Sequence, residues 1–206
     1  MKPLLLVGGG GHCRSCIDAV ESAGVYRING LIERKESGLS EVLGYPVVGS
    51  DDDLPALVGR FRNAVVAVGQ VKTALPRVRA WEQLVASGAT IPVIVSALAH
   101  VSRYAEVGDG TVVLHRAIVN AGATVGHNCI VNSFALVEHD AVIGDHCHVA
   151  TGAILNGGVH VGDGSFIGSG VVVREGVRIG QRVVISAGQV VFKDVPSDVV
   201  IRADQQ

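Results

Sequence analysis

Residues 131–149 read VNSFALVEHDAVIGDHCHV and carry an aliphatic residue at every sixth position. This spacing continues without a gap in both directions, over sixteen consecutive positions. They are Val101, Val107, Val113, Val119, Val125, Val131, Val137, Ile143, Val149, Leu155, Val161, Ile167, Val173, Ile179, Ile185 and Val191. The residue four positions after each is mostly small, as at Ala117, Cys129, Ala135, Cys147 and Ser165. Glycine often follows the aliphatic residue directly, as at Gly108, Gly126, Gly144, Gly162, Gly168 and Gly180.

A period of six matches neither the 3.6-residue period of a helix nor the two-residue period of an ordinary strand. It predicts a parallel β-helix in which three hexads form one triangular coil of about 18 residues. The aliphatic residues would fill the prism, and coils would stack about 4.8 Å apart. We expect the glycines to meet unusual backbone angles at the turns.

The part of the chain before residue 99 has a different pattern. Short apolar runs at Leu4–Val7, Ile28–Ile32, Ala64–Val68 and Val93–Val95 predict strands. Helical spacing between them predicts helices at Cys13–Ala23, Asp51–Val58 and Pro76–Ser87. This alternation predicts a Rossmann-like α/β domain with a small parallel sheet over residues 1–98, followed by the β-helix over residues 99–206.

Composition excludes several classes of protein. Hydrophobic residues make up 48% of the 206, which excludes a disordered chain. A net charge of −2 with scattered lysines and arginines predicts no nucleic-acid partner. No apolar run approaches the roughly 18 residues of a membrane span, and no signal peptide is recognisable, so we expect a cytoplasmic protein without a membrane span.

One histidine stands out in the repeats. His139 lies between Glu138 and Asp140, two residues after an inward aliphatic position, so we expect it near a turn at the prism surface. An imidazole there can accept a proton near neutral pH, and Asp140 could orient the ring and stabilise the imidazolium. A lone surface histidine is usually solvated and inert, but two flanking carboxylates favour a catalytic role.

The loop Gly8-Gly9-Gly10-Gly11-His12 follows a predicted strand and opens a predicted helix. Glycine there lets phosphate approach the backbone N–H groups at the helix N-terminus. As a dinucleotide fingerprint the loop fails, because Cys13 occupies the position of the third glycine.

Other cysteines and histidines have simpler explanations. Cys13 and Cys16 have the spacing of a redox motif, but Cys16 falls on the apolar stripe of its helix, so burial is favoured. Cys129 and Cys147 are one coil apart and should stack inside the prism, with His146 and His148 pointing out of it. His115, His127 and His139 recur at every second hexad and fall on different corners, so no metal site is predicted.

The hexads resemble the left-handed β-helix of hexapeptide-repeat acyltransferases, which form homotrimers with acyl-CoA in the groove between neighbouring prisms. Residues 132–148 are similar to the signature of bacterial sugar acetyltransferases with an N-terminal nucleotide-sugar-binding domain. This family includes bacillosamine and perosamine N-acetyltransferases and sialic acid O-acetyltransferases. The resemblance implies that His139 is the general base, supported by Asp140. It implies substrate contacts by Gly10, Gly11, His12, Glu33, Arg34, Gly69 and Asn132, and acetyl-CoA contacts by His148, Ser169 and Ala187.

The C-terminus departs from that family. Relatives end with a Gly-x-Pro-Ala-[Lys/Arg] segment beside the cofactor, whereas this chain ends Val199-Val200-Ile201-Arg202-Ala203-Asp204-Gln205-Gln206. The region that holds the end of coenzyme A is therefore expected to be altered.

The resemblance implies transfer of acetyl from acetyl-CoA to the amino group of a nucleotide-linked 4-amino-deoxysugar. No metal is expected, since a thioester is already activated. The alternatives are O-acetylation of a sugar of the sialic acid type, which the same histidine would serve, and a non-catalytic trimeric scaffold with a nucleotide-sensing domain.

Overall fold

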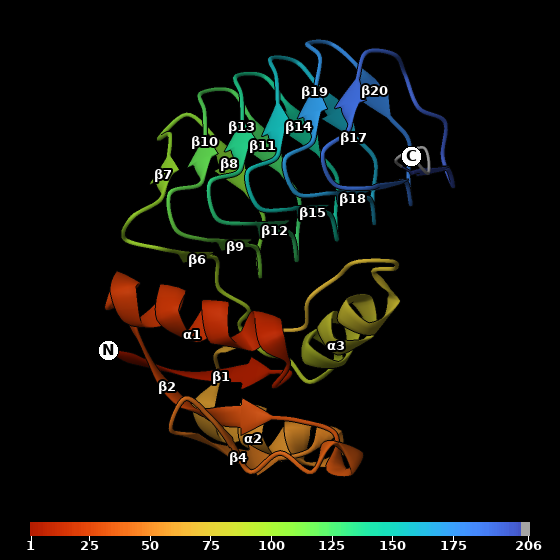
Figure 1. Cartoon of the computed structure of the whole chain (residues 1–206). Helices are drawn as coiled ribbons and strands as arrows, with labels where there is room; N and C mark the ends of the chain where they lie inside the picture. Colours follow the sequence, from red (N-terminus) through yellow and green to blue (C-terminus); the bar gives the residue numbers. More distant parts are fainter. Residues whose placement is uncertain (203–206) are drawn as a thin grey trace.

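The computed structural model describes residues 1–202 and shows an α/β domain beneath a triangular prism of stacked strands (Figure 1). The predicted fold, a Rossmann-like domain followed by a left-handed parallel β-helix, is confirmed. None of the helices in these residues is long and apolar enough to cross a membrane.

The N-terminal sheet has five strands in the order β3-β4-β2-β1-β5, all parallel except the β3–β4 pair. Helix α1 covers one face of this sheet, and α2 and α3 pack against the other. Gly24, in the left-handed conformation with a φ of 66°, ends α1. The elements are β1 (Lys2–Val7), α1 (Gly11–Ala23), β2 (Tyr26–Ile32), a 3-10 turn (Lys35–Ser37), β3 (Glu41–Val42), β4 (Tyr45–Gly49), a second 3-10 turn (Asp51–Asp53), α2 (Leu54–Phe61), β5 (Ala64–Val66) and α3 (Leu75–Ala86).

The prism has three faces, which we name by their strand counts. The seven-stranded face contains β6 (Ile94–Val95), β9 (Val112–Val113), β12 (Ile130–Val131), β15 (His148–Val149), β18 (Phe166–Ile167), β21 (Val184–Ile185) and β23 (Val200–Ile201). The six-stranded face contains β7 (His100–Val101), β10 (Ile118–Val119), β13 (Leu136–Val137), β16 (Ile154–Leu155), β19 (Val172–Val173) and β22 (Val190–Val191). The five-stranded face contains β8 (Glu106–Val107), β11 (Thr124–Val125), β14 (Val142–Ile143), β17 (His160–Val161) and β20 (Arg178–Ile179).

The first strand of the prism corrects one prediction. The sequence pattern places Val93–Val95 in the N-terminal sheet, but Ile94–Val95 forms β6 and pairs with β9, one coil further along the chain. Pairing along the prism thus starts before the predicted division of the chain after residue 98, a division that remains a prediction. At the other end, β23 extends the seven-stranded face, and residues 203–206 of the unusual tail lie outside the described residues.

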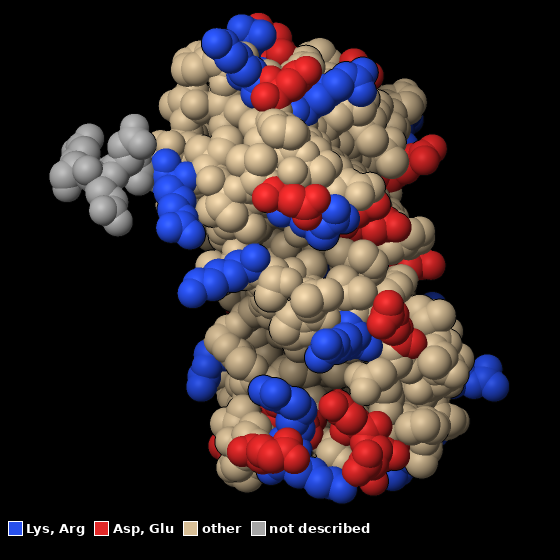
Figure 2. Space-filling view, turned by 90° about the vertical axis from the view of Figure 1, so that its right-hand side faces the viewer, with Lys and Arg blue, Asp and Glu red and all other residues tan. Residues whose placement is uncertain are grey.

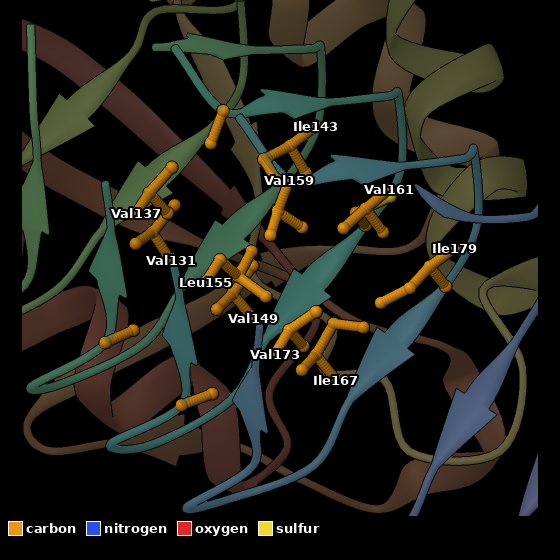
Figure 3. Close-up of a cluster of buried hydrophobic side chains, with 14 of the residues drawn as sticks. Val131, Val137, Ile143, Val149, Leu155, Val159, Val161, Ile167, Val173 and Ile179 are labelled. Carbon is orange, nitrogen blue, oxygen red and sulfur yellow. The ribbon is translucent and has the colours of Figure 1, made fainter. Parts of the chain in front are cut away.

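The repeat explains the interior of the prism. Aliphatic side chains from all three faces point inward and stack in columns (Figure 3), and small residues such as Ala135 and Cys147 are buried beside them. The glycines after the aliphatic positions allow neighbouring coils to pack closely, because a side chain there would overlap the next coil. Our expectation of unusual backbone angles at these glycines is therefore wrong. At Gly162, for example, an added Cβ would lie 2.7 Å from the backbone nitrogen of Gln181 in the next coil. Left-handed angles occur instead at other turn positions, including Asp140, with a φ of 59°.

Loss of one core side chain should destabilise the prism strongly. Leu155 is fully buried among the aliphatic columns, so Leu155→Ala is expected to cost about 2–5 kcal/mol of unfolding free energy. Urea unfolding at equal protein concentrations measures the loss, and Arg178→Ala, on the exposed side of β20, is the control. A loss no larger than that of the control would contradict the inward packing of Leu155.

The N-terminal domain covers the seven-stranded face of the prism. Along one border of this face, Arg77 and Gln70 bond to the carbonyls of Asn128 and Gly164. At the opposite border, Asp18 of α1 bonds to His115 Nε2 at 2.8 Å. Between the two borders, the cluster of α1 and the N-terminal sheet includes Ile94, Val112 and Leu114. The six- and five-stranded faces therefore lie away from this domain (Figure 1).

Candidate active site and nucleotide pocket

His139 and Asp140 lie at the turn between β13 and β14, on the edge shared by the six- and five-stranded faces. The Asp140 carboxylate accepts a hydrogen bond from His139 Nδ1 at 2.9 Å. Because a carboxylate only accepts, Nδ1 carries the proton and Nε2 is left free as a base. The bond to Asp140, together with the negative charges of Asp140 and Glu138, raises the pKa of His139 above its usual 6.5.

Glu138 supports the backbone of this turn. Its Oε2 accepts hydrogen bonds from Asn120 Nδ2 at 2.9 Å and from the His139 backbone N–H at 3.1 Å. These bonds lower the pKa of Glu138 below 4.5, so its carboxylate is ionised at neutral pH. The charge therefore lies directly beside the histidine.

A shallow, open depression of about 600 Å³ surrounds His139. It is lined by Glu138, His139, Asn156, Gly157, Glu175 and Gly176, with no lysine or arginine among these residues. Gly157 and Glu175 follow His139 by one and two full coils, so they stack above it along the same edge. Sequence reasoning missed both, although the coil length was sufficient to find them.

A second pocket, of about 580 Å³, lies at the carboxyl ends of the N-terminal strands. It brings together six residues that the resemblance implied as substrate contacts: Gly10, Gly11, His12, Glu33, Arg34 and Gly69. Helix α1 points its N-terminus at this pocket, with Gly10 as a cap that offers no side-chain hydrogen bond. Asp51, Arg79 and Gln83 also line it and were not predicted. Arg79 and Gln83 lie on α3, which carries no sequence signal for binding, and Asp51 lies in the 3-10 turn before α2.

The charges in this pocket suit an anionic ligand only in the part near Arg34, Arg79 and the N-terminus of α1. Burial, with smaller effects of His148 and Arg77, lowers the pKa of His12 to about 3, so its ring is neutral at physiological pH. Glu33 is engaged with the backbone N–H groups of Gly9 and Arg34. The positive charge available to a phosphate therefore comes from Arg79, from the N-terminus of α1 and from Arg34, which also pairs with Glu33 at 3.9 Å.

His148 points out of the prism as predicted, but the N-terminal domain buries it, leaving 7% exposed. Its Nδ1 lies 2.8 Å from the carbonyl oxygen of Gln70, which can only accept, so Nδ1 is protonated. Its Nε2 then accepts from Asn132 Nδ2 at 3.1 Å. Burial lowers the pKa of His148 to about 4, and with both nitrogens engaged, its implied contact with acetyl-CoA stays a prediction.

The structure places the predicted catalytic residues on one edge of the prism, and the predicted substrate contact Asn132 with the predicted cofactor contacts Ser169 and Ala187 on another. Asn132, Ser169 and Ala187 follow β12, β18 and β21, at the turns between the seven- and six-stranded faces. His139 lies at the turn on the opposite side of the six-stranded face. A single chain therefore does not bring these two groups together.

The four cysteines are all buried. Cys13, Cys16, Cys129 and Cys147 are buried free thiols, and burial raises the pKa of Cys13 to about 12. Within residues 1–202, no group of three or more histidine, cysteine or acidic side chains is arranged to hold a metal ion.

On the side of the molecule drawn in Figure 2, positive and negative side chains are interspersed and neither sign forms a patch.

Comparisons with known proteins identify two family matches in the chain. Residues 3–75 match the PglD N-terminal domain family, and residues 140–175 and 158–191 match the bacterial transferase hexapeptide family. No curated protein sequence matches the chain significantly. The hexapeptide match and the solved structures of acetyltransferases described next identify the protein as an acyltransferase built from hexapeptide repeats.

Solved structures define the family more closely. Perosamine N-acetyltransferase from Caulobacter crescentus, in complex with CoA and GDP-perosamine, is 30% identical, with a TM-score of 0.90. The match covers 97% of this chain and 93% of that one, and the solved forms include variants with one histidine replaced by asparagine or alanine. The acetyltransferase domain of PglB from Neisseria gonorrhoeae, in complex with acetyl coenzyme A, is 30% identical over 97% of this chain and 95% of that one, with a TM-score of 0.89.

The protein belongs to the family of hexapeptide-repeat sugar acetyltransferases that carry a PglD-type N-terminal domain. WeeI from Acinetobacter baumannii, 22% identical over 100% of this chain and 98% of that one with a TM-score of 0.86, shares the fold.

Proposed function

We propose that this acyltransferase moves the acetyl group of acetyl-CoA to the amino group of a nucleotide-linked 4-amino-deoxysugar, with His139 as the general base. The observation that carries the proposal is the exposed His139–Asp140 pair, with Nε2 free, in an acidic depression on the prism. The nucleotide would occupy the N-terminal pocket, with its diphosphate at the N-terminus of α1.

The chemistry follows from the state of His139. Nε2 accepts a proton from the sugar amine as the amine nitrogen attacks the thioester carbon. The carbon–sulfur bond then breaks, and the coenzyme A sulfur leaves and takes up a proton. Asp140 holds the ring through Nδ1 and stabilises the imidazolium that forms. Acetyl-CoA is the acyl-donor substrate, and the reaction needs no metal because the thioester is already activated.

The charge around His139 favours an amino sugar over sialic acid. Glu138, Asp140 and Glu175 are acidic, and no lysine or arginine lines the depression. An amine that arrives as its ammonium form is attracted there, whereas the carboxylate of sialic acid is repelled. This electrostatic difference supports N-acetylation over the alternative O-acetylation.

The proposed active unit is a homotrimer. The nucleotide pocket belongs to the domain that covers the seven-stranded face, and His139 lies on the edge away from that face. A sugar bound in one chain would reach His139 only if a neighbouring prism presents it. In a ring of three prisms, each edge that carries Asn132, Ser169 and Ala187 would face a His139 edge of the next chain. The groove between them would hold acetyl-CoA, and since acetyl-CoA is a metabolite of the cell interior, we propose a cytoplasmic location.

Release of free coenzyme A from acetyl-CoA tests the proposal directly. We expect turnover with at least one member of a panel of UDP-, dTDP- and GDP-linked 4-amino-deoxysugars. Turnover on sialic acid alone would replace the proposal with O-acetylation. Nucleotide binding without turnover on any sugar would instead favour the non-catalytic scaffold.

The pH profile should report the His139–Asp140 bond. A general base works only when neutral, so kcat/KM should rise with pH through the pKa of His139, above 6.5. In Asp140→Asn the carboxylate that raises this pKa is gone, so the midpoint of the acid limb should move to lower pH. A profile of kcat/KM against pH for both proteins measures the shift, and an unchanged midpoint would contradict the role of Asp140.

Nucleotide binding should be sensitive to charge at Gly10. A Cβ at Gly10 meets no atom within 4 Å, and aspartate is a favoured N-cap, so Gly10→Asp should fold normally. Its carboxylate would repel the diphosphate, so the Kd for the nucleotide-sugar should rise about 10- to 100-fold, corresponding to about 1.4 kcal/mol for each factor of ten. Calorimetry measures the Kd, and Gly10→Ser is the uncharged control. Equal affinities for the two variants would place the diphosphate elsewhere.

A further inference from the structure

Two glycines flank the His139–Asp140 pair, one on each neighbouring coil. Gly122 precedes Asp140 by one coil, and Gly157 follows His139 by one coil. A Cβ built at Gly157 would lie 2.7 Å from both Cε1 and Nε2 of His139, and a Cβ at Gly122 would overlap Oδ1 of Asp140. The two functional side chains thus occupy a slot that exists because the adjacent coils carry no side chains there.

The slot matters because little else holds the ring. The His139 side chain is 66% exposed, so no packed side chains fix its outer surface. Its orientation depends on the bond from Nδ1 to Asp140 and on the space that the missing side chain of Gly157 leaves in the next coil. Atoms only 2.7 Å apart without a hydrogen bond repel each other, so a methyl group at position 157 would displace the ring from the position in which it bonds to Asp140.

We propose that Gly157 is a positioning residue for the general base: its missing side chain keeps the His139 imidazole in the orientation that bonds Asp140 and presents Nε2 to the substrate. This inference rests on the proposed function for its catalytic consequence. The steric part concerns the ring alone and holds for the free protein.

Gly157→Ala is a clean test, while the same change at Gly122 is not. Gly122 has a φ of 74°, so a side chain there would strain the backbone whatever its neighbours do. Gly157 is not among the residues with positive φ, so alanine keeps its backbone conformation. The matched control is Gly59→Ala in α2, where a Cβ meets no atom within 4 Å.

In kinetics, Gly157→Ala should lower kcat by about 10- to 100-fold, as expected for a misplaced catalytic group, with the KM for both substrates within about threefold. The midpoint of thermal unfolding should match that of the wild type, because the displaced ring is exposed. Gly59→Ala should leave kcat unchanged.

A direct readout of the ring makes the test independent of turnover. NMR titration of histidines labelled at Cε1, with His139→Asn assigning the resonance, gives the His139 titration midpoint. The charged groups facing the ring are Asp140, Glu138 and Glu175. In Gly157→Ala the midpoint should fall, because the bond to Asp140 is the main cause of the raised pKa of His139.

The outcomes separate the two proposals. A lower kcat with a lower midpoint supports the positioning role of Gly157. An unchanged midpoint overturns it, even if kcat falls, because the methyl group would then act on the substrate. If Gly157→Ala lowers the His139 titration midpoint but the wild type turns over no sugar, the positioning of the ring by Gly157 is supported and the proposed function is refuted.

Discussion

Replacing His139 with asparagine should lower kcat by about 10²- to 10⁴-fold, the usual contribution of a general base. Asparagine retains a polar side chain of similar reach but has no nitrogen that accepts a proton. The substitution removes no buried contact, because His139 is mostly exposed, so folding and substrate affinity should be preserved. The loss should therefore fall on kcat, with KM nearly unchanged.

Coenzyme A release at saturating substrates measures this loss, and calorimetry with each substrate alone checks binding. The control is His100→Asn, an exposed histidine of β7 that lies outside both pockets. Activity of His139→Asn within a few fold of the wild type would show that His139 is not the general base. The proposed catalytic role of this edge of the prism would then be refuted.

Mixing two variants with complementary defects should restore activity if the active site is built between chains, provided that the nucleotide-sugar concentration is too low for Gly10→Asp to bind it. His139→Asn lacks the base but keeps the nucleotide pocket, and Gly10→Asp has the opposite defect. The two would be co-expressed with different tags, and the mixed trimers purified through both. In a ring of three with sites between neighbours, every mixed trimer has one site that combines an intact edge with an intact pocket, so activity should recover to about a third of the wild type.

The reasoning behind this expectation is geometric. The nucleotide pocket lies in the N-terminal domain, which covers the seven-stranded face, whereas the His139 edge borders only the other two faces. A site contained within one chain would give no recovery, since each chain would still carry one of the two defects. The control mixture combines His139→Asn with itself under both tags. Recovery no greater than this control would refute the shared site.

The sequence predicted the prism well because each hexad marks, by its aliphatic residue, which of its side chains points into the interior. Val137 and Ile143 point inward for the same local reason as the other aliphatic positions, and no long-range information is needed. The prediction for Val93–Val95 was wrong because an apolar run does not reveal its pairing partner. A signal was present nevertheless: Val95 precedes Val101 by one hexad and continues the repeat.

The N-terminal strands β3 and β4 gave no such signal. Tyr45–Gly49 contains Pro46, which lacks a backbone donor and argues against a strand when the sequence is read alone. The glycine loop and His12 were predicted from local sequence, whereas Arg79 and Gln83 reach the same pocket through the packing of α3. The burial of His148 was likewise unpredictable, because it depends on Gln70, which lies far earlier in the chain.

The three-hexad coil also governs how such a chain tolerates insertions and deletions. Removal of one whole coil between Asp140 and Ser169 would shorten the prism, and every later side chain would keep its face. Removal of a single hexad would instead turn the remainder of the chain by a third of a revolution and carry Ser169 and Ala187 to another edge. Length variation in this part of the gene therefore keeps each side chain on its face only when it occurs in whole coils, and each coil gained or lost changes the distance along the axis between the base and the predicted cofactor contacts by one equal step.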